Sequence, residues 1–163
     1  MSVQLFKKVD YPLSKLLDDI HVGEIGLPDI QRPFVWERRK ARELFDSMYK
    51  GFPVGYLLFW ENDLSAEQRQ IGTGAKQKAP YLLIVDGQQR LTCLYAVLKR
   101  VPIVTRQFQD EHLRIAFRPK DETFEVTSAA HRLDPEYIGD ISDIWMFEDG
   151  YHNFVSHFLT RLR

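Results

Sequence analysis

Apolar residues recur at helical spacing in three segments of the chain. The i, i+3, i+4, i+7 pattern predicts helices over 12–20, 37–50 and 88–100. Pro12 suits the first turn of the first helix because its fixed φ is already helical, and Gly51 ends the second. The side chains expected on the buried faces are Leu13, Leu16, Leu17 and Ile20, then Ala41, Leu44, Phe45 and Met48, then Leu91, Leu94, Tyr95 and Leu98.

Shorter apolar runs lie between these helices and predict β-strands. Residues 56–60 and 81–85 are continuously apolar, which is typical of strands covered on both faces of a sheet. Residues 113–117 and 123–126 alternate in part on either side of a Pro-Lys-Asp-Glu turn, and so predict a hairpin. Residues 25–27 form at most a short strand.

The remaining segments show no clear period. Residues 62–79 hold two glycines and several charges, so we expect an exposed loop there. A final helix is expected from residue 148. The predicted fold class is α/β (α+β), with helices packed against a small, mixed sheet, and a length of 163 residues favours one domain.

Composition excludes several classes of protein. With 22 basic and 23 acidic residues the net charge is −1, so the chain lacks the basic surplus of a domain that binds nucleic acid over its whole surface. The single cysteine, Cys93, excludes an intrachain disulfide and fits a reducing cytoplasm. We interpret it as a packing residue. No apolar run approaches the ~18 residues that span a membrane, so we predict a cytoplasmic protein without a membrane partner.

The second continuous apolar strand runs directly into the string Asp86-Gly87-Gln88-Gln89-Arg90, where a predicted helix begins. A strand, a glycine turn and a helix N-terminus can hold a phosphate, because the glycine lets the backbone approach the anion and the first N–H groups of the helix point at it. Arg90 adds a bidentate donor. Asp86 fits such a site if it holds Mg²⁺, which binds through a carboxylate plus substrate phosphates.

A structural interpretation of the same turn stays open. Turns of the type strand–Asp-Gly–helix are common, and Asp86 can cap the helix while Arg90 pairs with it. The density of polar residues between two apolar segments favours a ligand instead. The chain has no GxxxxGK[ST] segment, so it is not a P-loop NTPase.

Three blocks of sequence resemble one protein family. The string 86–90 is similar to the DGQQR signature of the GmrSD-type restriction endonuclease N-terminal family, and to the glycine-x-x-arginine phosphate motif of the ParB/sulfiredoxin-like fold. Residues 27–36 resemble the family's block of Gln-Arg followed by aromatic-Val-Trp, and residues 47–55 resemble its glycine-aromatic-proline-x-glycine turn. The blocks stand in the expected order within residues 10–100, and no comparable signature follows residue 105.

The resemblance implies a ParB/sulfiredoxin-like fold with a defined organisation. Residues 1–105 are expected to form the nucleotide-binding core with the DGQQR motif, and residues 106–163 to continue the same domain as a strand pair and the start of a helical region. A C-terminal helical region with an HNH-type nuclease domain usually follows in this family. Residues 158–163 resemble the middle of an amphipathic helix, so we expect a chain truncated before that region.

The implied function is a nucleotide-binding, NTP-hydrolysing regulatory domain of a modification-dependent DNA restriction system for phage defence. Its cofactors are Mg²⁺ and a nucleoside triphosphate, as substrate or effector. Its partners are modified foreign DNA and a nuclease domain, in the same longer chain or in a partner subunit. Two alternatives stay open: a module that binds nucleotide or modified DNA without hydrolysis, and a ParB-like, metal-dependent DNA-nicking domain.

The resemblance also implies how the site is assembled. The ParB-like arrangement brings Gln31 and Arg32 to the string 86–90, whereas in the alternative Arg32 only stacks on Phe34 or Trp36. The expected nucleotide-binding residues are Gln31, Arg32, Gly87, Gln88, Gln89 and Arg90. The expected catalytic residues are Asp86 as the Mg²⁺ ligand, Gln88 or Gln89 as the group that orients water, and Arg90 as the group that neutralises charge.

A basic patch on the second predicted helix is a candidate contact for DNA phosphates. It contains Arg38, Arg39, Lys40 and Arg42. A charge run of this kind is more often a solvated face of a helix, and Glu37 and Glu43 flank the patch and dilute its field. The histidines show no spacing typical of a zinc site or a metalloprotease.

Overall fold

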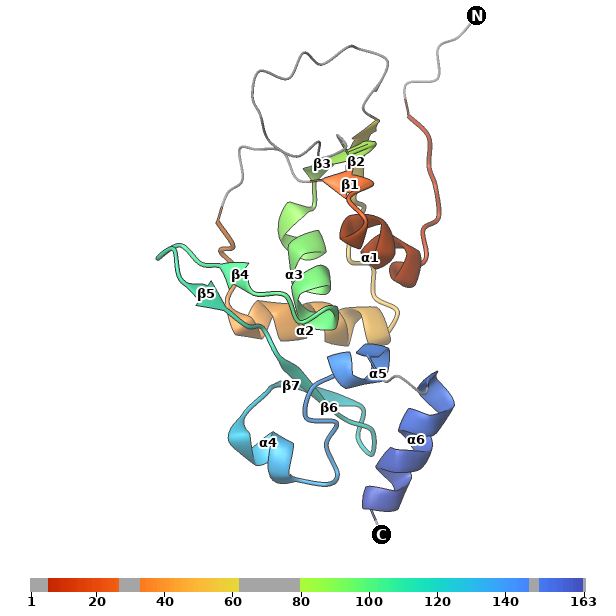
Figure 1. Cartoon of the computed structure of the whole chain (residues 1–163), viewed down its shortest axis with the longest axis vertical. Coiled ribbons are helices and arrows are strands. Elements are labelled where there is room, and N and C mark those ends of the chain that lie inside the picture. Colours follow the sequence, from red (N-terminus) through yellow and green to blue (C-terminus); the bar gives the residue numbers. More distant parts are fainter. Residues whose placement is uncertain (1–5, 27–32, 62–79, 147–149, 163) are drawn as a thin grey trace, which may run out of the picture.

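The structure is a computed structural model that describes residues 6–26, 33–61, 80–146 and 150–162. These residues form a mixed fold of helices and small sheets (Figure 1), so the predicted α+β class is confirmed. A three-stranded sheet lies at one end of the molecule, and a β-hairpin with the C-terminal helices lies at the other. The loop predicted over 62–79 lies outside the described residues.

The predicted helices and strands are all present, and their ends differ from the observed ones by at most two residues. In chain order the elements are α1 (Leu13–His21), β1 (Ile25–Gly26), α2 (Arg38–Tyr49), β2 (Leu58–Glu61), β3 (Leu82–Asp86), α3 (Gln88–Leu98), β4 (Ile103–Val104), β5 (Asp110–Glu111), β6 (Ile115–Arg118), β7 (Thr123–Val126), α4 (Ala129–Leu133), α5 (Ser142–Met146) and α6 (Gly150–Arg161). None of these helices has both the length and the apolar character needed to cross a membrane.

β3 is the central strand of the three-stranded sheet. β1 pairs with it in parallel and β2 pairs with it antiparallel, so the strand order is β1-β3-β2. Ile25 and Ile84 of the sheet meet Leu16 of α1 and Leu91 of α3 in one apolar cluster. The two helices therefore cover the same face of the sheet (Figure 1).

The described residues leave the opposite face of the sheet uncovered, which corrects the expectation that residues 56–60 form a strand covered on both faces. β2 is an edge strand, and its Leu58 and Trp60 side chains are 43% and 67% exposed. Val85 of β3 is also exposed, whereas Phe59 packs into the cluster with α1 and α3. The apolar run is therefore covered by the described helices on one side only.

α3 is buried on nearly all sides and joins two apolar clusters. Leu91 belongs to the cluster at the sheet, while Leu94, Val97 and Leu98 pack into a larger one. Burial also raises the pKa of the Cys93 thiol to about 12, which agrees with its interpretation as a packing residue. The larger cluster also contains Leu17, Phe34, Ala41, Leu44, Phe45, Ala96, Ile103, Leu113, Ile115, Phe124 and Ile141. Residues on both sides of position 105 thus share one core.

The hairpin expected in the C-terminal half is present as β6 and β7, with Arg118 opposite Thr123 at its turn. Phe117 and Phe124 of the hairpin lie against each other and against Tyr49 of α2, with ring centroids 4.5 to 5.6 Å apart. The sequence pattern did not predict β4, β5, α4 or α5. These elements have two to five residues each, which is too short to show a period.

Arg100 fastens the C-terminal end of α3 to α5. The residue has a left-handed backbone with φ 55°, and its guanidinium contacts Asp143 and donates to Ser142 Oγ at 2.6 Å. Ser142 Oγ donates in turn to Oδ1 of the buried Asp140 at 2.6 Å. Because a buried carboxylate must be paired or hydrogen-bonded, this cluster fixes how the C-terminal segment packs on α3.

The open face of the sheet should contribute little to stability. Ile84→Ala empties a site on the covered face and is expected to lower the free energy of unfolding by about 2–5 kcal/mol. Trp60→Ala removes a larger side chain from the open face and is expected to cost no more than about 1 kcal/mol. Denaturant unfolding of the two variants measures both values. A Trp60→Ala loss as large as that of Ile84→Ala would show that the open face is covered in solution.

Candidate functional site

The turn between β3 and α3 is built around Gly87. This residue is the N-cap of α3 and has φ 88°, a left-handed conformation that glycine adopts at little cost. Space is also limited, because a Cβ at this position would lie 2.5 Å from Leu57 Cδ2 and 3.1 Å from Arg90 Nη2. The left-handed backbone therefore favours glycine, whereas the crowding comes from the ends of two flexible side chains, which can shift.

No side chain caps the N-terminus of α3 within the described residues. The first internal hydrogen bond of the helix runs from Leu91 N–H to Gly87 O at 3.0 Å. The N–H groups of Gln88, Gln89 and Arg90 precede it and so have no partner within the helix. The interpretation of Asp86 as a helix cap is therefore wrong, and no described side chain occupies this end of the helix.

Asp86 itself points into solvent. Its side chain is 76% exposed, and its Oδ2 lies 3.5 Å from Arg90 Nη2. The pairing part of the structural interpretation is therefore confirmed. An ion pair with one partner in solvent contributes about 0–1 kcal/mol, so the carboxylate is available to another cation at small cost.

The side chain of Arg90 is more buried than that of Asp86, since it is only 20% exposed. Its Nη1 donates to Val54 O at 2.5 Å. The guanidinium also lies against Gly55, which has φ 85° and where a Cβ would overlap Nη1. Arg90 thus fastens the turn that follows α2 to the start of α3, a contact that the sequence reasoning missed. In the sequence, the only indication of this contact is the presence of Gly55 and Gly87, the two glycines that lie against the guanidinium.

Gln89 fastens the loop that precedes α2. Its Oε1 accepts the N–H of Val35 at 2.9 Å, and its Nε2 lies 3.5 Å from Pro33 O. The segment before the long helix therefore meets the 86–90 turn, as expected. Gln31 and Arg32, the two residues expected to act there, lie outside the described residues.

The two glutamines of the turn differ in the hydrogen bonds that their side-chain amides make. The amide of Gln89 is committed to the backbone of residues 33–35. The half-buried side chain of Gln88 makes no hydrogen bond to another described residue. If one of them orients a water, Gln88 is the one whose amide binds no other described residue.

The described residues offer no group of three histidine, cysteine or acidic side chains around a common point. A metal ion at Asp86 would therefore take its other ligands from phosphate oxygens and water. Mg²⁺ is bound in this way in proteins, through one or two carboxylates plus substrate phosphates. The exposed carboxylate beside an open helix N-terminus fits that ion.

The basic patch of α2 is largely neutralised by glutamates. Arg38 Nε lies 2.6 Å from Glu111 of β5, and Arg39 Nε lies 3.0 Å from Glu43. Arg42 is 3.6 Å from the same Glu43, and Lys40 stands over the ring of Trp36. These contacts weaken the field that DNA phosphates would meet, and a DNA contact at Arg38, Arg39 and Arg42 stays a prediction.

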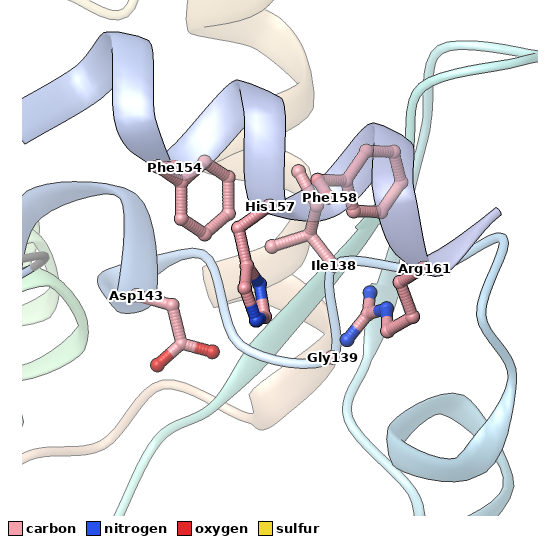
Figure 2. A pocket seen from close by; sticks show the side chains of 7 residues that line it. All are labelled: Ile138, Gly139, Asp143, Phe154, His157, Phe158 and Arg161. Carbon is pink, nitrogen blue, oxygen red and sulfur yellow. The ribbon is translucent and has the colours of Figure 1, made fainter. Parts of the chain in front are cut away.

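A small pocket lies between α5, α6 and the 138–139 segment, far along the chain from the 86–90 turn (Figure 2). Two of its polar groups already have partners, since Asp143 contacts Arg100 and Arg161 Nη2 donates to Tyr137 O at 2.6 Å. Phe154 and Phe158 of α6 supply the apolar wall. This arrangement serves to pack α6 onto the hairpin end of the molecule.

Comparison with known proteins gives a family. The sequence model of the GmrSD restriction endonuclease, N-terminal domain, matches residues 13–155. The match extends well past residue 105, where the recognisable blocks end. The chain is also similar to uncharacterized protein MJ0686 of Methanocaldococcus jannaschii, with 36% identity over 51% of this chain and 16% of the relative. The chain thus spans about a sixth of that relative's length.

No solved structure matches the chain, so the ParB/sulfiredoxin-like assignment stays a prediction. The family match, in contrast, covers most of the described residues and includes the 86–90 turn, both loops fastened to it and the hairpin end. The protein therefore belongs to the family of the GmrSD restriction endonuclease N-terminal domain.

Proposed function

We propose that this domain of a restriction system binds a Mg²⁺-bound nucleoside triphosphate at the 86–90 turn and hydrolyses it, and that this reaction regulates DNA cleavage by a nuclease domain of the same system. Family membership supports the restriction system. The observation that supports the nucleotide is that no described side chain caps the N-terminus of α3 behind Gly87, because oriented N–H groups that are not bonded within the helix favour an anion.

The phosphates would be held by backbone and by one guanidinium. The N–H groups of Gln88, Gln89 and Arg90 supply donors at the positive end of the helix dipole. Arg90 keeps one of its five N–H donors on Val54 O, and the remaining ones can face an anion beside Gly87. Arg32, which directly precedes Pro33 in the chain, is proposed as a second cation.

Asp86 is the proposed ligand of the metal. When bound, Mg²⁺ supplies positive charge against the phosphate oxygens and so favours phosphoryl transfer. The carboxylate is exposed and only weakly paired, so it can turn toward a bound cation without disturbing the fold. Release of the Asp86 contact also leaves Arg90 Nη2 available to the phosphates.

Gln88 is proposed to orient the water that attacks the terminal phosphorus. The new bond joins the water oxygen to phosphorus, and the bond to the bridging oxygen breaks. The products are the nucleoside diphosphate and inorganic phosphate, which takes up the protons of the water. Arg90 stabilises the charge that develops on the transferred group.

The geometry favours this proposal over DNA nicking. A nicking centre needs several metal ligands from the protein, and among the described residues Asp86 belongs to no group of three or more histidine, cysteine or acidic side chains that could hold a metal ion. A binding module without hydrolysis uses the same residues, so only turnover separates it from an enzyme.

Replacement of Arg90 tests the site. Arg90→Ala is expected to weaken nucleotide binding by at least about tenfold, the scale of one lost hydrogen bond to a charged group. It should also lower the free energy of unfolding by about 1–3 kcal/mol, because Val54 O loses its donor. Calorimetry with ATP, GTP, CTP and UTP in Mg²⁺ measures binding, and Arg132→Ala on α4 is the matched control. A folded Arg90→Ala protein with unchanged affinity would assign Arg90 a purely structural role.

Replacement of Asp86 tests the metal. Asp86→Asn removes a charge from an exposed position and should leave the fold intact. Affinity for the nucleotide in Mg²⁺ is expected to fall by at least about tenfold, the loss typical of even an outer partner of a metal ligand, while affinity in EDTA is unchanged. Asp121→Asn, in the β6–β7 turn, is the control. Equal losses with and without Mg²⁺ would argue against metal binding at Asp86.

Replacement of Gln88 separates an enzyme from a switch. Gln88→Ala keeps a good helix former in the first turn of α3 and should leave the dissociation constant of the nucleotide unchanged. Phosphate release is expected to slow by about 10²-fold, the scale of one lost transition-state hydrogen bond. If the wild-type chain binds a nucleotide but releases no phosphate, the isolated domain is a binding module.

A further inference from the structure

A second pocket opens beside the first half of α3, where this helix faces the end of α1 and the strand β1 (Figure 1). Its lining is mostly apolar, and it holds about 320 Å³ of empty space when its open mouth is included. Ligand sites in proteins commonly have ~300–1,000 Å³. The described residues that line the pocket are Ile20, Ile25, Gly26, Leu91, Thr92 and Tyr95.

The pocket begins directly after the 86–90 turn. Leu91, whose N–H makes the first internal hydrogen bond of α3, is already part of its lining. Thr92 follows Gln88 by four residues, so the two side chains lie on the same face of the helix. Tyr95 continues this face, about 10 Å along the axis from Gln88 at the usual rise of a helix. Because helical side chains tilt toward the N-terminus, Thr92 and Tyr95 lean toward the turn.

This face is where α3 leaves space among the described residues. Thr92 and Tyr95 are half-buried, whereas every other residue from Leu91 to Leu98 is buried. The Thr92 hydroxyl makes no hydrogen bond to another described residue, whereas the helical Thr160 donates to the carbonyl of Ser156. The pocket therefore combines an apolar wall with a hydroxyl that no described residue binds.

We propose that this pocket holds the base of the nucleotide, an inference that rests on the proposed function of the 86–90 turn. The phosphates lie on the N–H groups at the start of α3, and the nucleoside follows the face that Gln88, Thr92 and Tyr95 share. The substrate class is then a nucleoside triphosphate whose base is enclosed by apolar side chains, with the Thr92 hydroxyl as its hydrogen-bonding partner.

The length of this face favours one nucleotide over a strand of nucleic acid. Four residues beyond Tyr95, Lys99 Nζ pairs with Asp18 Oδ1 of α1 at 2.9 Å. The part of the face that is open among the described residues therefore extends from Gln88 to Tyr95. One nucleoside with its phosphates fits this span, whereas paired bases are too wide to enter a recess between two helices.

The test compares ligands that have a base with one that has none. Calorimetry on the 163-residue chain measures binding of ATP, GTP, CTP, UTP and inorganic tripolyphosphate, all in Mg²⁺. The variants are Thr92→Leu, which fills the pocket with a good helix former, and Thr92→Val, which removes only the hydroxyl. Thr160→Leu, at an exposed position of α6, is the matched control. Thermal unfolding of each variant confirms that the fold is kept.

Thr92→Leu is expected to weaken every nucleotide that the wild type binds by about 5- to 150-fold, the scale of overfilling a packed site. Thr92→Val should weaken the same nucleotides about 2- to 10-fold, the equivalent of one lost hydrogen bond. Thr160→Leu should bind as the wild type does. Tripolyphosphate should bind all four proteins equally.

Proton NMR gives a readout that does not depend on a variant. With the preferred nucleotide bound to the wild-type chain, nuclear Overhauser effects are expected between protons of the base and the methyl groups of Ile20 and Ile25. A bound nucleotide whose base shows no contact with these methyl groups would overturn the proposal.

Unchanged nucleotide affinity in Thr92→Leu would also overturn the base pocket and leave the phosphate site standing. Equal losses for nucleotides and tripolyphosphate would overturn it too, because Thr92 would then act on the turn or on the fold. If the wild-type chain binds neither kind of ligand, the phosphate site is wrong and the base pocket fails with it.

Discussion

The structure depends on the burial of α3 between two apolar clusters. Leu91 anchors one end of the helix beneath the sheet, and Leu94, Val97 and Leu98 anchor the rest among α2 and the C-terminal hairpin. A helix that is apolar on nearly all sides has no freedom to rotate or slide without exposing several side chains to water. The position of its first turn, and of every group fastened there, follows from that burial.

Two side chains of the first turn of α3 hold neighbouring segments that lack regular structure in place by hydrogen bonds. Gln89 binds the backbone of Pro33 and Val35, and Arg90 binds that of Val54. Both contacts go to main-chain groups, so they hold the loops in place whatever side chains the loops carry. The helix therefore organises the site through its polar N-terminal turn and the core through its apolar remainder.

Several features of this site could be read from the sequence because they follow from local chemistry. A strand, Asp-Gly and a helix start predict the turn at Gly87, and the spacing of Leu91, Leu94 and Leu98 predicts the buried helix. The family likeness placed the segment before α2 next to the turn, and Gln89 makes that contact.

Other features depend on partners that are distant in the chain. The acceptor of Arg90 is the carbonyl of Val54, and any residue type supplies a carbonyl, so no side-chain pattern marks it. Glu111 neutralises Arg38 from a two-residue strand that shows no period. The apolar run of β2 likewise predicts burial on two faces, but which faces are covered depends on where the helices pack.

The edge position of β2 has a consequence for the behaviour of the domain at high concentration. Among the described strands, β2 pairs on one side only, and Leu58 and Trp60 lie exposed along it. Unpaired backbone groups next to apolar side chains are a template for adding another strand. With a formal net charge of −1, electrostatic repulsion between copies is weak near neutral pH. The isolated domain is therefore colloidally least stable close to physiological pH, and contact with another surface along β2 would relieve that tendency.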